Sequence, residues 1–139
     1  MARRLGASHT INNRTQKLHT ALRRLTTSGP DVVVEAIGLP ETFRAAVEEV
    51  AFTGRVVYIG YTKEDVSYPA TLFVKKELDI RGTRNATIDD FKKVIKMLEA
   101  KKFPAEEMIT RVVPLAQVGS ALRDWDANHA KVIRILVRL

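Results

Sequence analysis

The stretch from Asp31 to Tyr61 reads DVVVEAIGLPETFRAAVEEVAFTGRVVYIGY and has the order strand, helix, strand. Residues 32–37 are almost continuously apolar, which is typical of a parallel strand covered on both faces. Pro40 suits the first turn of a helix, and residues 56–59 form a second apolar run. Nucleotide-binding α/β folds are built from this unit, yet no G-x-G-x-x-G occurs in the 139 residues.

The same patterns predict further elements on both sides of this stretch. Upstream, residues 2–5 are expected to end a helix at Gly6, followed by a short strand at 9–12 and an amphipathic helix at 15–25. Downstream, the predicted elements are a helix turn at 72–77, strands at 78–83, 110–113 and 131–137, and helices at 88–101 and 114–125. Strands that alternate with helices predict an α/β fold with a mainly parallel sheet, in a single domain over residues 1–139.

The composition argues against several classes of function. The formal net charge is +7, but the basic residues occur as scattered pairs and only 6% of residues are aromatic, so no nucleic-acid surface is predicted. The chain has no cysteine, and His9, His19 and His129 share no ligand spacing, so no metal site is predicted. No apolar run approaches the roughly 18 residues of a membrane span. We therefore expect a cytoplasmic protein with no membrane partner.

Four segments resemble the zinc-type medium-chain alcohol and polyol dehydrogenases, within which they are most similar to the sugar-alcohol and sugar-acid branch. The segments are RLGASHTIN (4–12), residues 29–61, LFVKKELDIRGTRNATIDDF (72–91) and VPLAQVGSALRDW (113–125). The resemblance covers essentially the whole chain. It implies a zinc-bearing catalytic domain followed by a dinucleotide-binding domain, and this chain matches only the later part of the second.

The resemblance thus implies a partial Rossmann-like sheet, the later half of a doubly wound domain, with flanking helices. The glycine-rich loop that holds the pyrophosphate would lie upstream of Met1. The cofactor of the family is NAD or NADP, and we expect the isolated chain to bind it weakly or not at all. Zinc belongs to the family, but this chain has no site for it. The isolated chain is therefore expected to be inactive.

The resemblance places cofactor-binding residues after three predicted strands, where ligands of open α/β sheets bind. Ala36 and Ile37 would line the nicotinamide ribose. Ile59, Gly60 and Tyr61 would approach the carboxamide, and Thr83, Arg84 and Asn85 would offer it backbone groups. The alternative is that these residues only end strands and make turns.

Acidic residues give no catalytic hypothesis. Glu35 follows an apolar strand, where the family also has an acid, and a structural hydrogen-bonding role is expected for it. Asp89 and Asp90 are explained by the start of a helix, because residues 87–90 resemble a capping box with Asp in place of the usual Glu or Gln. Asp124 and Asp126 are expected to lie on the surface.

The Rossmann strand order, 3-2-1-4-5-6, has a consequence for a chain that begins after strand 2. Residues 9–12 would lie about 14 Å from residues 32–37, and the latter would become an edge strand. The edge would be covered by the N-terminal segment, by a second copy, or by an upstream part supplied as another chain. We expect a homodimer through a sheet edge. In family enzymes the strand at 78–83 also pairs across a dimer.

Two functions remain open from the sequence. The chain is either part of an NAD(P)-dependent zinc-type dehydrogenase that acts on alcohols, polyols or sugar acids, or a stand-alone module that binds a nucleotide or a partner chain without catalysis.

Overall fold

The computed structural model describes residues 2–128 and 130–139, so His129 lies outside the described residues. The chain divides into two compact units, Met1–Asn85 and Ala86–Leu139. The single domain expected from the chain length remains a prediction. Among the described residues, no helix combines the length and apolar character needed to cross a bilayer.

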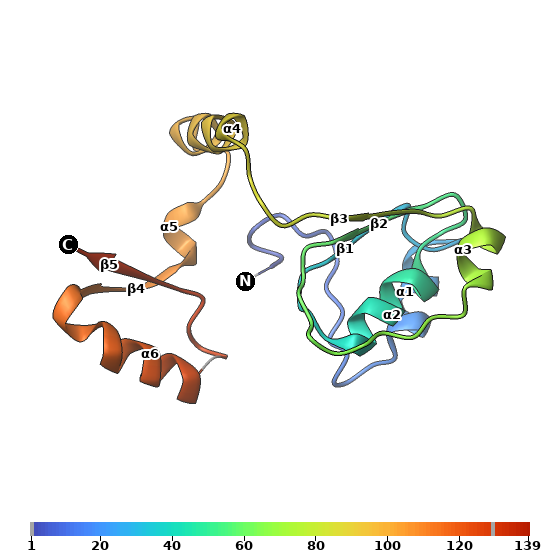
Figure 1. Cartoon of the computed structure of the whole chain (residues 1–139), viewed down its shortest axis with the longest axis horizontal. Helices are drawn as coiled ribbons and strands as arrows, with labels where there is room; N and C mark the ends of the chain where they lie inside the picture. The colour runs from blue at the N-terminus through green and yellow to red at the C-terminus, as the bar shows by residue number, and fades with distance from the viewer. Residues whose placement is uncertain (1, 129) are drawn as a thin grey trace. The chain divides into compact units, whose positions relative to one another are not determined.

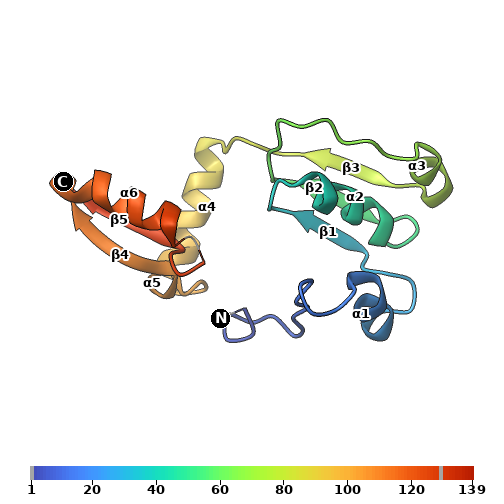
Figure 2. The same cartoon turned by 90° about the horizontal axis from the view of Figure 1, so that it is seen from below.

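The first unit contains a parallel sheet of three strands in the order β1-β2-β3 (Figure 2). The strands are β1 (Val32–Glu35), β2 (Arg55–Tyr58) and β3 (Asp79–Gly82), and the helices are α1 (Leu18–Leu25), α2 (Pro40–Glu49) and α3 (Thr71–Lys76). In the register, Val33 pairs with Val56 and Val56 with Ile80. The strand, helix, strand order of residues 31–61 is therefore confirmed, with β1 at one edge.

Only one face of β1 is covered by the rest of the described chain. Helix α2 packs against β1 and β2, and Val33 contacts the buried cluster of Ala46, Val50 and Val56. By contrast, Val32 is 53% exposed and Val34 is 55% exposed. The prediction that both faces are covered is wrong for this chain, because side chains alternate along a strand and only one face has a helix against it.

The N-terminal elements also differ from the prediction. Residues 2–5 form turns rather than the end of a helix, although Gly6 has the expected left-handed φ of 105°. Residues 9–12 form no strand. A strand needs a hydrogen-bonding neighbour, and the only strand that pairs with β1 in the described chain is β2.

The second unit has its own pair of strands, β4 (Ile109–Pro114) and β5 (Arg134–Arg138), which are parallel (Figure 1). Its helices are α4 (Ile88–Glu99), α5 (Ala105–Met108), the 3₁₀ turn η1 (Leu115–Gln117) and α6 (Val118–Ala127). The α/β class with parallel strands is confirmed. The parallel strands lie in two sheets and not in one, since β4 and β5 pair only with each other among the described residues.

A capping box begins α4, as the sequence predicts. The Asp90 carboxylate accepts a hydrogen bond from the Thr87 backbone N–H at 2.9 Å, and the Thr87 hydroxyl accepts one from the Asp90 backbone N–H at 3.3 Å. Asp89 lies 3.2 Å from Lys92 Nζ. Both acids are therefore explained by the helix start.

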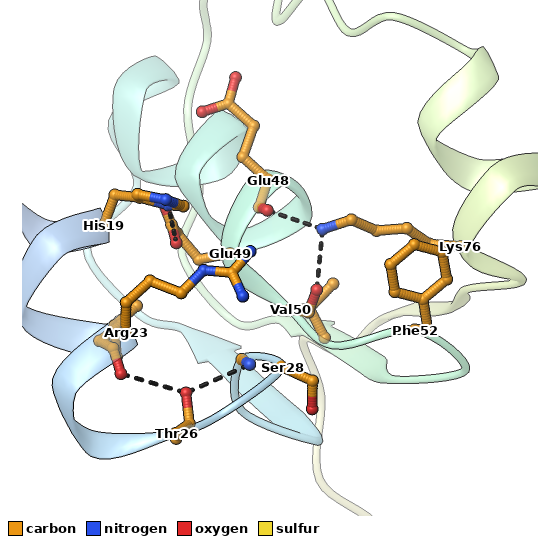
Figure 3. A pocket seen from close by; sticks show the side chains of 11 residues that line it. His19, Arg23, Thr26, Ser28, Glu48, Glu49, Val50, Phe52 and Lys76 are labelled. Carbon is orange, nitrogen blue, oxygen red and sulfur yellow. Dashed lines mark hydrogen bonds and ion pairs between the residues drawn. The ribbon is translucent and has the colours of Figure 1, made fainter.

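A lysine from α3 closes the C-terminal end of α2 (Figure 3). Lys76 Nζ donates to the carbonyl oxygens of Glu48 at 2.6 Å, Val50 at 2.8 Å and Val47 at 3.2 Å. The last carbonyls of a helix lack partners within it, and a cation there also suits the helix dipole. Burial lowers the pKa of the Lys76 ammonium.

We predict that Lys76→Met lowers the free energy of unfolding by about 1–3 kcal/mol, because the carbonyls at the end of α2 lose a charged donor. Thermal and denaturant unfolding would measure the change. Lys75→Met, at the exposed neighbouring position of the same helix, is the matched control and should leave stability unchanged. Equal stabilities of the two variants would contradict the capping role.

Candidate functional site

The three parallel strands of the first unit end at the same edge of the sheet (Figure 2). Each strand is followed in the sequence by predicted cofactor residues. Glu35 pairs with Tyr58, and Tyr58 with Gly82, so the carboxyl ends of the strands are aligned. The parallel register thereby brings all eight predicted residues to the same edge. They are Ala36 and Ile37 after β1, Ile59, Gly60 and Tyr61 after β2, and Thr83, Arg84 and Asn85 after β3.

Backbone hydrogen bonds tie these strand ends to one another. The carbonyl of Glu35 accepts from the N–H groups of Ile59 at 2.8 Å and Gly60 at 3.0 Å. The N–H of Thr83 donates to the carbonyl of Tyr58 at 3.0 Å. These hydrogen bonds therefore fix where the segments after the three strands begin relative to one another.

A cation–π contact joins the residues after β2 and β3. The central guanidinium carbon of Arg84 lies 5.7 Å from the centroid of the Tyr61 ring. Tyr61 is nevertheless 73% exposed, Ile37 is 71% exposed and Ile59 is 54% exposed. The edge therefore presents apolar side chains and one positive charge to solvent.

Glu35 is the buried polar residue of this edge, with 4% of its surface exposed. Its Oε1 accepts hydrogen bonds from the N–H groups of Ile37 and Gly38, both at 2.9 Å, and from the Thr42 hydroxyl at 2.6 Å. Burial alone would raise the pKa of the Glu35 carboxyl, but the donors Thr42, Gly38 and Ile37 together lower it below its usual value of 4.5. This is the hydrogen-bonding role expected for the acid.

Two glycines allow the segments after β1 and β2 to touch. Gly38 has a φ of 88°, and a Cβ there would lie 2.7 Å from the Tyr61 carbonyl oxygen. A Cβ on Gly60 would collide with Oε2 of Glu35. Both positions need glycine, because the segments after β1 and β2 approach each other closely there. This gives a physical reason for the alternative that these residues make turns.

Sequence reasoning missed the part played by Thr42. Its hydroxyl donates to Glu35 Oε1, and its oxygen also accepts from the Leu39 N–H at 3.3 Å at the start of α2. A threonine in the first helical turn after Pro40 is a recognisable signal, but nothing in the sequence connects it to an acid seven residues earlier.

The residues at the carboxyl ends of β1, β2 and β3 suit the nicotinamide half of a dinucleotide better than the pyrophosphate half. Exposed apolar side chains next to backbone groups at strand ends fit a nicotinamide ring and its carboxamide. The pyrophosphate half needs a glycine-rich loop at a helix N-terminus, and the sequence contains no G-x-G-x-x-G.

The described residues do not fit a zinc site. No group of three or more His, Cys, Asp or Glu side chains in residues 2–128 and 130–139 is placed to hold a metal ion. His19 instead contacts Glu49, with Nδ1 3.0 Å from Oε2 (Figure 3).

Comparison with known proteins now identifies the family. The family model for zinc-binding dehydrogenases matches residues 1–100. The chain belongs to this family. Its homologues include NAD(P)-dependent alcohol and polyol dehydrogenases of the zinc type, as the sequence resemblance implied.

Curated relatives and a solved structure give the extent of the similarity. L-galactonate-5-dehydrogenase of Escherichia coli K12 is 29% identical over 102 residues, which are 73% of this chain and 30% of that enzyme. D-xylulose reductase of Scheffersomyces stipitis is 31% identical over 96 residues, which are 68% of this chain and 26% of that enzyme. The chain spans about a quarter to two fifths of the length of the curated relatives it matches.

The fold is that of a crystal structure from Escherichia coli CFT073, described as a short chain alcohol dehydrogenase complexed with the cofactor NADH. The TM-score is 0.90 at 22% identity, and the match covers 99% of this chain and 40% of that one. The Rossmann-like class is therefore confirmed.

We predict that Gly60→Ala destabilises the first unit by about 1–3 kcal/mol, because the new methyl group overpacks against Glu35 and the backbone of Gly38. Gly82→Ala is the matched control, since a Cβ on Gly82 in β3 would meet nothing within 4 Å. Chemical denaturation of both variants tests the contact. A Gly60→Ala protein as stable as Gly82→Ala would show that the segments after β1 and β2 do not pack as described.

Proposed function

We propose that this chain forms the nicotinamide side of the cofactor site of an NAD(P)-dependent, zinc-type alcohol or polyol dehydrogenase. The observation that carries this proposal is the alignment of the carboxyl ends of β1, β2 and β3, which places three exposed apolar side chains and the backbone groups of eight residues along one edge. Membership in the dehydrogenase family supports the assignment.

Each part of the edge would have a separate task toward the bound cofactor. Ile37 and Tyr61 would cover the nicotinamide ring and keep water from it. Backbone groups of residues 59–61 and 83–85 would orient the carboxamide, and Arg84 would hold Tyr61 in place through the cation–π contact. The cofactor itself supplies the chemistry, which is reversible hydride transfer at the nicotinamide ring.

The relatives suggest the class of substrate. L-galactonate-5-dehydrogenase is named for a sugar acid, and D-xylulose reductase is named for a ketose, which is the oxidised form of a polyol. We therefore propose a polyhydroxylated alcohol or a sugar acid as the substrate of the complete site. The described residues include no zinc ligand set, and the sequence contains no glycine-rich loop. This supports weak cofactor binding and no catalysis by the chain alone.

We predict that calorimetric titration gives a dissociation constant of about 1 mM for NADH, equivalent to about 4 kcal/mol, because only one half of the cofactor is held. NADPH should bind with similar affinity, since no contact proposed here involves the adenosine ribose.

Two exposed apolar positions provide the variant and its control for this titration. Ile37→Asp should weaken NADH binding, because it places a charge against the ring. Phe52→Asp changes an exposed residue in the segment between α2 and β2, away from the carboxyl ends of the strands, and should have no effect. Absence of any heat with wild-type protein at the highest soluble cofactor concentration would contradict the proposal.

We propose in addition that two copies of the chain associate through the outer edge of β1. This edge pairs with no other strand of the described chain, and a groove of about 700 Å³ lies beside it, lined largely by apolar residues. A second copy is the occupant that we propose, because an unpaired edge strand can extend its sheet by pairing with the same strand of another chain.

Light scattering after gel filtration should give twice the mass of one chain. Val34→Lys puts a charge on the β1 edge strand and should produce a monomer. Ile80→Lys makes the same change on β3, at the opposite edge of the sheet, and should leave the dimer intact. A monodisperse wild-type monomer would overturn the proposal, and dissociation by Ile80→Lys alone would assign the interface to β3.

A further inference from the structure

Glu35 lies beneath two of the three segments that carry the predicted cofactor residues. The first, the β1 loop, comprises residues 36–39, and the second, the β2 loop, comprises residues 59–61. Oε1 of Glu35 accepts hydrogen bonds from the N–H groups of Ile37 and Gly38, so the carboxylate holds the backbone of the β1 loop in place. The Thr42 hydroxyl donates to the same oxygen and fixes the start of α2 against it.

The other carboxylate oxygen faces the β2 loop. Oε2 is buried and has no hydrogen-bond partner among the described residues. It lies so close to Gly60 that any side chain there would meet it. The backbone carbonyl of Glu35 also accepts from the N–H groups of Ile59 and Gly60. One residue therefore contacts the β1 loop with its side chain and the β2 loop with both its side chain and its backbone.

Two opposing effects act on this carboxylate. The buried oxygen without a donor costs free energy, whereas the three donors to Oε1 favour the charged form and lower the pKa of Glu35. Tyr58 is the other titratable residue close to it, and the pKa of the Tyr58 phenol is raised, chiefly by burial and by Tyr68, with a smaller contribution from Glu35. What the carboxylate provides is an anionic acceptor that three donors can share at the point where the two loops meet.

We propose that Glu35 is a positioning residue that holds the β1 loop and the β2 loop in a single arrangement and thereby sets the distance between Ile37 and the Ile59–Tyr61 segment on the nicotinamide side of the site. This inference rests on the proposed function. Glu35 would act through the two loops, because its side chain is buried and its Oε1 accepts hydrogen bonds from Ile37, Gly38 and Thr42.

The test compares Glu35→Gln with Glu41→Gln in the full chain. Both substitutions remove one negative charge near the start of α2, but Glu41 is exposed and makes none of the contacts to the loops. Two quantities are measured at a temperature well below the thermal unfolding midpoint. The first is the NADH dissociation constant. The second is the hydrogen-exchange rate of the Ile37, Gly38 and Gly60 amides relative to that of Val56 in the core. Thr42→Val serves as a second, milder variant that keeps the carboxylate and removes one donor.

We expect Glu35→Gln to raise the NADH dissociation constant about tenfold and to speed exchange at the loop amides by at least a similar factor, because a charge-assisted hydrogen-bond set is lost. Thr42→Val should shift both quantities in the same direction by about threefold, and Glu41→Gln should shift neither.

The proposal is overturned if Glu35→Gln speeds exchange equally at the loops and at Val56 while NADH affinity below the midpoint is unchanged, because that result describes a purely structural acid. If wild-type protein fails to bind NADH, the proposed function fails. The exchange measurement then still decides whether Glu35 holds the two loops, since selective loosening at residues 37, 38 and 60 supports it and uniform loosening rejects it.

Discussion

The parallel pairing of β1 with β2 and of β2 with β3 is the constraint on which the rest of the first unit depends. Because the three strands run in the same direction and in register, their carboxyl ends meet at one edge. The segments that follow the strands must then pass close to one another, and this crowding explains both the glycines at 38 and 60 and the buried acid at 35. The candidate site is a result of sheet geometry before it is a result of side-chain chemistry.

Much of this geometry was predictable from local sequence patterns. Three signals depend only on residues that are close together in the sequence: the apolar run at 32–37, Pro40 at a helix start and the Thr87–Asp90 capping box. The structure contains the elements that they predict. The eight site residues follow from the resemblance together with the rule that ligands bind beyond strand ends. Their placement at one edge is observed, whereas their contact with a cofactor remains a proposal.

The features that could not be predicted depend on partners distant in the sequence. The strand expected at 9–12 has suitable residues but no neighbour to pair with, and the one-sided covering of β1 depends on which face α2 occupies. Likewise, the division into two sheets arises because β4 pairs with β5 and not with β3. The link between Thr42 and Glu35 was also invisible, since a hydroxyl in a first helical turn is usually occupied with its own helix.

The contact between Gly60 and Glu35 also constrains how this family can vary. A methyl group at position 60 and a full-length acid at position 35 compete for the same space, so neither residue can change size independently. A relative with alanine in place of Gly60 should have a shorter residue, such as aspartate or asparagine, in place of Glu35. The two positions, 25 residues apart in sequence, would then be inherited as a pair, and that pairing would be visible as covariation wherever the chain has diverged.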